Sequence, residues 1–278
     1  MPLRLAAYCL TLACAAVLII GCDPAPPAGS APQKNAARAP ESTPNEDSGQ
    51  GDGYAYHIRY PQLPAEWSAL ADALRAYAAT QKKDFLDARS ETPATNAPPA
   101  HLDLEFNVAR RTNDFVSVSA NGSSDTGGAH PASIVASFNL HSSDGKLIAL
   151  PDLFSDASAA LVALSDEARR QLEGRFEAKL RETLPEKNQA GALQNMRDWV
   201  ERGTAAKAEN FAVFLVDGLD AKAIGLTLIF PPEQVAPYAD GTQQIEVPAK
   251  VFYKLLKPEY SDAFQIDTEA EKLAPGVR

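Results

Sequence analysis

Alternation of apolar and polar residues predicts that a sheet is the main element of this chain. At residues 101–108, apolar side chains alternate strictly with polar or charged ones. This period of two is typical of a strand that has one face on a hydrophobic core and the other in water. Shorter patterns of the same kind predict further strands at residues 54–60, 115–120, 134–140, 211–216, 223–230 and 243–247.

Apolar residues at helical spacing lie between these groups of strands. They predict long helices at residues 66–86, 156–182 and 189–202, and a short helix at residues 248–256. The strands occur in hairpin runs and do not alternate singly with helices, which favours the α+β class. We therefore expect a mainly antiparallel sheet packed with two or three helices.

The N-terminus has the features of an export signal. Arg4 precedes an apolar run at residues 5–20, and Gly21 and Cys22 follow it. The run is short for a helix that spans a bilayer, which needs about 20 apolar residues. The pattern resembles a lipobox, in which the cysteine receives diacylglycerol and becomes the new N-terminus. Residues 1–21 are therefore predicted to be a lipoprotein signal peptide, with Cys22 as the lipid attachment site. An uncleaved anchor or an ordinary signal peptide is the alternative.

Two segments have a composition typical of chain without regular structure. Residues 22–53 are rich in Pro, Ala, Ser and Gly and contain no large apolar residue. They cannot bury enough surface to offset the entropy of ordering, so we predict a disordered tether. Residues 259–278 are predicted to be a polar tail. The acyl chains on Cys22 would hold the folded part at the bacterial envelope, facing the periplasm, on the inner or the outer membrane.

Composition narrows the classes of partner. The chain has 278 residues, of which 45% are hydrophobic, so it can build a substantial core. A formal net charge of −10 argues against nucleic acid, because phosphate binding needs a basic surface. The same charge favours basic partners, or it serves solubility alone. All three cysteines lie in the first 22 residues, so the folded part contains no disulfide and no thiolate site.

The sequence contains no pattern that predicts catalysis. None of the four histidines has a second ligand at the spacing of a metal site. The pair Gly127-Gly128 lacks the later lysine or third glycine of a phosphate-binding loop, and no nucleophile elbow is present. We therefore expect a protein that is not an enzyme and has no metal or cofactor. A hydrolase that uses His130 and a nearby carboxylate is the least favoured alternative.

Two short segments are unusual for a domain without a binding function. In the first, residues 123–131, Gly127 and Gly128 allow backbone shapes closed to other residues, and His130 follows them. The second contains Tyr238 and Asp240, and an exposed loop tyrosine is a common anchor in recognition. These five residues are our candidate ligand-binding set. The alternative is that both segments are structural turns, with Tyr238 packed on the core.

The same segments resemble the extracytoplasmic domain of RsiV-type anti-sigma factors. The resemblance is carried by short, ordered motifs at residues 127–131 (GGAHP), 144–146 (DGK), 150–154 (LPDLF), 235–241 (VAPYADG) and 245–248 (IEVP). It covers residues 54–258 and implies two parts. Residues 54–125 would be the smaller N-terminal subdomain of that family, and residues 126–258 the RsiV-like domain itself.

The resemblance also implies a class of function. The best-understood member binds lysozyme directly and then releases a sigma factor, and related domains precede peptidoglycan deacetylase modules. We expect neither the sigma-factor segment nor a deacetylase module in this chain, so the outer binding function is what would remain. The sequence thus predicts a lipid-anchored, non-catalytic module that captures or inhibits a lysozyme-like muramidase. A lipoprotein that binds peptidoglycan glycan is the alternative.

Overall fold

The computed structural model describes residues 45–91, 99–219 and 221–266. Cys22 and the predicted signal peptide lie outside these residues. Residues 42–278 form one compact unit, and the two hydrophobic clusters of the structure both lie within it. This segment therefore carries all the packing that the structure describes, and we expect it to fold on its own.

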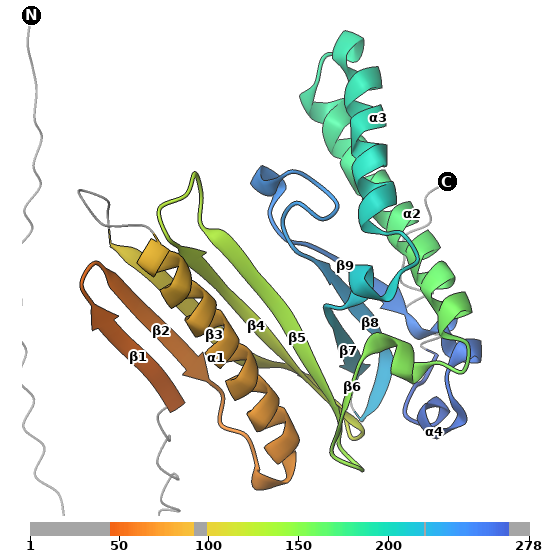
Figure 1. Cartoon of the computed structure of the whole chain (residues 1–278). Helices are drawn as coiled ribbons and strands as arrows, with labels where there is room; N and C mark the ends of the chain where they lie inside the picture. The colour runs from red at the N-terminus through yellow and green to blue at the C-terminus, as the bar shows by residue number, and fades with distance from the viewer. Residues whose placement is uncertain (1–44, 92–98, 220, 267–278) are drawn as a thin grey trace, which may run out of the picture. The chain divides into compact units, whose positions relative to one another are not determined.

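The first layer is a six-stranded sheet, ordered β1 to β6 in sequence (Figure 1). Its strands are Asn45–Gly51, Tyr54–Tyr60, Ala100–Arg111, Phe115–Asp125, Ala132–His141 and Lys146–Ile148. All neighbouring strands are antiparallel except β2 and β3, which are parallel and are joined through helix α1 (Ser68–Glu91). The α+β class and the mainly antiparallel pairing are confirmed.

Helix α1 covers one face of this sheet. The buried residues of α1 pack on the alternating apolar residues of β3 and β4 and form the first hydrophobic cluster. Leu102, Leu104 and Phe106 belong to this cluster, as the period of two predicted. The polar partners in β3 point to the other face, where His101, Asp103 and Asn107 are exposed.

Strand β1 corrects the predicted tether, because residues 45–51 belong to the sheet. Their polar composition hid this, since an edge strand gains most of its order from backbone hydrogen bonds to its neighbour. The register pairs Gly49 with Tyr56 and Gly51 with Tyr54. A Cβ on Gly49 would lie 2.6 Å from the ring of Tyr56, so the glycine leaves room for the tyrosine to cover the strand.

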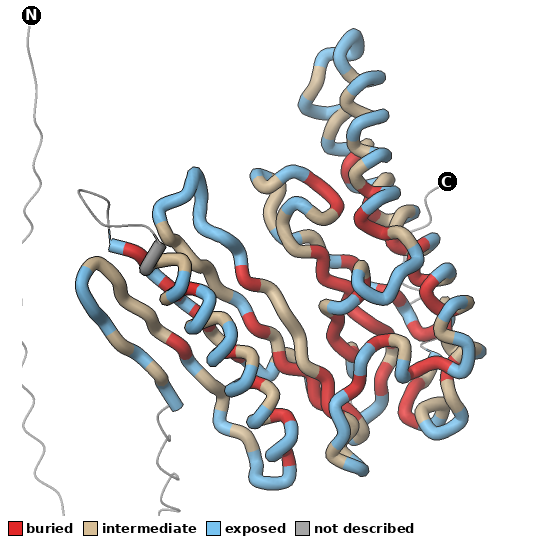
Figure 2. The backbone as a smooth tube through the Cα atoms, in the orientation of Figure 1, coloured by how far each residue is buried: buried red, intermediate tan, exposed pale blue. Residues whose placement is uncertain are grey.

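The second layer is a three-stranded antiparallel sheet with two long helices. Its strands are β7 (Phe214–Leu219), β8 (Lys222–Phe230) and β9 (Gln243–Pro248), and the helices are α2 (Ala157–Thr183) and α3 (Glu186–Gly203). The predicted stripe of α2 is buried from Leu161 to Phe176 and forms the centre of the second hydrophobic cluster (Figure 2). The side chain of Asp156 caps α2 by accepting from the amide of Ala159 at 2.9 Å.

The C-terminal part of the chain differs from its prediction. Short 3-10 turns at Ala249–Val251 and Tyr253–Leu255 replace the helix predicted at 248–256, and Pro258–Ser261 forms the one-turn helix α4. The predicted polar tail also begins too early. Phe264 is 3% exposed and packs in the second cluster against Phe115 and Phe252. A single phenylalanine among polar residues has no periodicity that could reveal its burial.

The boundary predicted between residues 125 and 126 does not separate two layers. It falls in the turn between β4 and β5, and these strands pair from Phe115 and His141 to Ser124 and Ala132. The motif region that resembles the RsiV-like domain therefore begins inside the first sheet. The physical division lies after β6 instead, where the chain leaves the first sheet for α2.

Two buried side chains and one half-buried side chain of the first sheet bind the open edge of β7. Asn139 donates to the carbonyl of Phe214 at 2.9 Å and accepts from the Ser117 hydroxyl at 2.5 Å. The amide of Val216 donates to the Ser117 hydroxyl at 3.0 Å, and the amide of Phe214 donates to the Ser137 hydroxyl at 2.8 Å. We call this row of hydrogen bonds between the two layers the polar seam.

Asp217 of β7 lies at the end of the polar seam. Its carboxylate accepts from Arg110 of β3 at 3.0 Å and from Thr227 of β8 at 2.6 Å. Strand β7 thus crosses β5, β4 and β3 in turn.

None of the helices in the described part of the chain is both long and apolar enough to cross a membrane.

The polar seam yields a stability prediction. Asn139→Ala removes the partner of two buried groups, the Phe214 carbonyl and the Ser117 hydroxyl. We expect the free energy of unfolding to fall by about 2–4 kcal/mol, because unsatisfied buried groups keep their full desolvation penalty. Urea unfolding of residues 42–278, followed by circular dichroism, measures this loss.

Asn121→Ala is the matched control, since Asn121 lies on the same strand face as Ser117 but is exposed. It should change the free energy of unfolding by no more than about 0.5 kcal/mol. Equal losses in the two variants would mean that the seam does not hold the layers together.

Candidate functional site

The two unusual segments of the sequence meet in the structure. The imidazole of His130 stacks on the ring of Tyr238, with centroids 3.9 Å apart and planes inclined by 24°. The Tyr238 hydroxyl donates to the carbonyl of Pro131 at 2.9 Å. His130 is exposed and Tyr238 is half-buried. The stack and this hydrogen bond, whose partners are 107 residues apart in sequence, therefore link two distant loops.

The first loop is the tip of the β4–β5 hairpin. Asp125 turns the chain by accepting from the amide of Gly127 at 3.0 Å. Gly127 has a φ of +95°, a backbone conformation that residues with a side chain rarely adopt. The backbone of Gly128 does not have a positive φ. The ring nitrogen Nδ1 of His130 lies 3.3 Å from the carbonyl of Pro131, so it donates there when it carries the proton. The Pro131 carbonyl oxygen thus lies within hydrogen-bonding distance of both side chains of the stacked pair.

The second loop is a 3-10 turn, Tyr238–Asp240, that follows Pro237. The amides of Asp240 and Gly241 close it by donating to the carbonyls of Pro237 and Tyr238, each at 2.9 Å. On its other side, the Asp240 carboxylate forms an ion pair with Lys179 of α2. The turn is therefore held between the hairpin tip and the α2–α3 helices.

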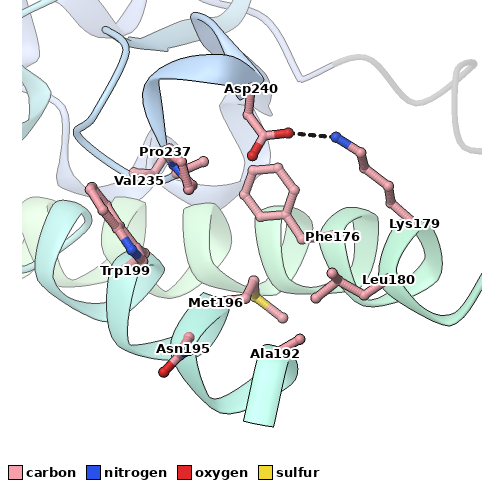
Figure 3. A pocket seen from close by; sticks show the side chains of 11 residues that line it. Phe176, Lys179, Leu180, Ala192, Asn195, Met196, Trp199, Val235, Pro237 and Asp240 are labelled. Atoms are coloured by element: carbon pink, nitrogen blue, oxygen red, sulfur yellow. Dashed lines mark hydrogen bonds and ion pairs between the residues drawn. The ribbon is translucent and has the colours of Figure 1, made fainter. Parts of the chain in front are cut away.

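A largely apolar pocket of about 330 Å³ opens beside this turn. Figure 3 shows its side chains converging from α2, from α3 and from the loop before Tyr238. The lining residues are Phe176, Lys179, Leu180, Ala192, Asn195, Met196, Trp199, Val235, Ala236, Pro237 and Asp240. Sequence periodicity placed Met196 and Trp199 on the apolar stripe of α3, yet both remain half-exposed, so that stripe is incompletely covered.

The structure places all five candidate residues of the described chain at this junction. Gly127, Gly128 and His130 form the hairpin tip, and Tyr238 and Asp240 form the facing turn. The alternative in which Tyr238 packs on the core is wrong, because Tyr238 packs on His130 and is not part of either hydrophobic cluster. Lys179 was missed by the sequence analysis, since nothing in a helical charge pattern indicates a partner on a distant loop. The predicted lipid site, Cys22, lies outside the described residues.

The carboxylates at the junction have partners other than His130. Asp125 is used by the amide of Gly127 and Asp240 by Lys179, and neither forms an ion pair with His130. No group of three or more His, Cys, Asp or Glu side chains in the described ranges could hold a metal ion. What the junction offers chemically is a partly exposed aromatic stack with polar side chains beside it.

Part of the chain is similar to known proteins. Residues 151–250 match a family model described as a protein of unknown function, DUF3298. The chain is 22% identical over 213 residues to the peptidoglycan-N-acetylmuramic acid deacetylase PdaC of Bacillus subtilis, a match that covers 76% of this chain and 41% of PdaC. The chain thus spans about two fifths of the length of that relative.

Two crystal structures are also similar to this chain. A DUF3298 family protein from Pseudomonas aeruginosa has a TM-score of 0.48 and 17% identity, over 77% of this chain and 92% of its own. A member of the same family from Bacteroides fragilis has a TM-score of 0.47 and 15% identity, over 79% and 94%.

The two adjacent glycines of the hairpin tip allow a matched test of the junction. Gly127→Ala should strain the tip by about 1–2 kcal/mol, because its backbone lies at positive φ. Gly128→Ala should be nearly neutral, since a Cβ there meets its nearest atom, the His130 carbonyl oxygen, at 3.6 Å. We expect the ring-current shift of the His130 protons by Tyr238 to shrink in Gly127→Ala alone, as measured by NMR. Unchanged His130 shifts in Gly127→Ala, or equal changes in both variants, would contradict the geometry of the tip.

Proposed function

We propose that this protein is a non-catalytic binding module of the bacterial envelope that captures a lysozyme-like muramidase. Lipid on Cys22 would anchor it to the membrane, facing the periplasm. The contact surface would be the hairpin tip with His130 and the turn with Tyr238. Capture at this position would block the muramidase or hold it away from the cell wall.

The observation that supports this proposal most directly is the stack of His130 on Tyr238. Tyrosine supplies a large contact area at a small cost in conformational entropy, and it is enriched among residues that dominate binding. Here the tyrosine is already fixed by the stack and by its hydrogen bond to Pro131. A partner would therefore meet a pre-organised surface, which reduces the entropic cost of association.

The choice of a muramidase rests on charge and on resemblance. Lysozyme is strongly basic, and a chain of formal net charge −10 would attract it at long range. Two of the five motifs that carry the resemblance to the lysozyme-binding family, at residues 127–131 and 235–241, meet at this junction. The similarity to a protein named as a peptidoglycan deacetylase supports a role at the cell wall in general.

The proposal that the module is not an enzyme is supported by the environment of His130. A hydrolase would need a nucleophile or an activated water close to this ring, with a carboxylate or similar group to orient it. The nearest hydrogen-bond partner of His130 is instead the carbonyl of its own neighbour, Pro131. The ring is used to pack on Tyr238.

A second candidate function is binding of peptidoglycan glycan. The relative named as acting on N-acetylmuramic acid favours it, and exposed aromatic rings are suitable platforms for sugar rings. Binding of residues 42–278 to purified sacculi in the absence of any protein partner would support this alternative over muramidase capture.

Calorimetry with c-type lysozyme tests the first proposal. We expect residues 42–278 to bind lysozyme, and the affinity to fall as salt is raised, because salt screens the attraction between the acidic module and the basic enzyme. Tyr238→Ala should weaken binding by about tenfold or more, the effect of removing a central aromatic anchor. Tyr238→Phe should retain most of the affinity.

Val108→Ala is the surface control, since Val108 is 40% exposed at the end of β3 that is remote from the hairpin tip. It should leave the affinity unchanged. Absence of heat with wild-type protein at high micromolar concentration would remove c-type lysozyme as the ligand. Full affinity in a folded Tyr238→Ala variant would remove the aromatic junction from the contact surface.

A further inference from the structure

The pocket beside the Tyr238 turn is built for an apolar ligand. Its walls are the side chains of Phe176, Leu180, Met196 and Trp199 from the two helices and of Val235 from the loop. Several of these residues are half-exposed, although they lie on the apolar stripes that should be covered. Leaving such surface in water is unfavourable by about 25 cal/mol for each Å².

The size and lining of the pocket decide between classes of ligand. A volume of about 330 Å³ is at the low end for ligand pockets, which range over about 300–1,000 Å³. A sugar ring carries hydroxyl groups on every side, and apolar walls would leave most of them without hydrogen-bond partners. An unbranched alkyl chain has no such groups, and the apolar side chains of α2, of α3 and of the loop before Tyr238 can surround it (Figure 3).

The mouth of the pocket carries one cation that can exchange its partner. The side chain of Lys179 is 59% exposed and pairs with Asp240, whose side chain is 28% exposed. An ion pair this open to water is weak, so a ligand anion can displace Asp240 from the ammonium group at little cost. Figure 3 shows the Lys179 side chain extending from α2 toward Asp240.

We propose that this pocket binds the free anion of a medium-chain fatty acid. The alkyl chain lies among Phe176, Met196 and Trp199, and the carboxylate pairs with Lys179 in place of Asp240. This site adjoins the proposed protein-binding surface, because Asp240 of the Tyr238 turn lines the pocket, whereas neither His130 nor Tyr238 does. The fatty-acid titration contains no lysozyme, so its result does not depend on whether lysozyme binds.

The two tryptophans of the chain make the test specific. Trp199 lines the pocket, whereas Trp67 is 6% exposed in the cluster under α1. In residues 42–278 carrying Trp67→Phe, decanoate below its micellar concentration should shift the Trp199 emission to shorter wavelength in a saturable way. A bromine-substituted decanoate should quench Trp199 there, and should leave Trp67 unquenched in the complementary Trp199→Phe protein.

Variants at the mouth should change affinity in opposite directions. Lys179→Met should weaken decanoate binding by about two- to fivefold, the range expected for an exposed ion pair. Asp240→Asn should strengthen it by a similar factor, because it removes the competing carboxylate. Decyltrimethylammonium should show the reverse preference, since its cationic head meets Asp240.

A third pair of variants tests the pocket itself. Ala192→Phe fills the space and should abolish the Trp199 response, while Ala190→Phe, at an exposed position of the same helix outside the lining, should not. The proposal is overturned by a flat titration, or by a response that survives in Ala192→Phe. It is also overturned if the Trp199 emission depends on protein concentration without ligand, because a second copy of the chain would then cover the pocket.

Discussion

The hydrogen bonds between the edge of β7 and the side chains of Ser117, Ser137 and Asn139 are the constraint on which the other features depend. β7 is the edge strand of a three-stranded sheet, and its backbone groups need partners when they are buried. The first sheet provides them from side chains instead of from a further strand. The two sheets therefore stay distinct, and β7 crosses the strands below it instead of extending their ladder.

This seam also determines where the candidate site forms. Ser137 and Asn139 lie on β5, and the same strand begins just after His130 and Pro131. Phe214 pairs with Leu228 of β8, and the loop that follows β8 carries Tyr238. Because the strands are rigid between these points, fixing β7 on β5 places the hairpin tip and the Tyr238 turn at a set distance. The stack of His130 on Tyr238 is a consequence of the seam more than a cause of it.

Some of this architecture follows from sequence, and the reason is periodicity. β3 shows strict alternation because one of its faces is covered by α1 and the other is open to water. The pattern of apolar and polar residues therefore indicates which of its side chains are buried. The stripe of α2 was predicted for the same reason. β1 and Phe264 could not be predicted, because their order comes from a neighbouring backbone and from a single contact with the core. Neither leaves a period in the sequence.

The sequence predicted which residues belong to the candidate site, but it did not predict that the two turns lie in contact. Paired glycines before His130 and a proline before Tyr238 mark turns that hold a side chain in place, and the sequence reveals each turn separately. That the two turns touch depends on strand register and on the crossing of β7, which are long-range features. The ion pair of Asp240 with Lys179 could not be predicted for the same reason. Lys179 belongs to a helix whose charged face looks solvated, and the loop that reaches it is far away in sequence.

The seam and the junction contribute differently to the free energy of unfolding, because they differ in burial. Ser117 and Asn139 of the seam are buried and hydrogen-bonded, so a change at Asn139 affects the whole fold. The junction is partly exposed, and its stack and hydrogen bonds are each worth about 1 kcal/mol. Residues 151–250, which match the family model, include Lys179 and Tyr238 but not His130. One half of the aromatic pair thus lies within that matched region and the other half comes from the first sheet. Sequence changes at the hairpin tip can therefore alter this surface while the seam, and with it the fold, stays as it is.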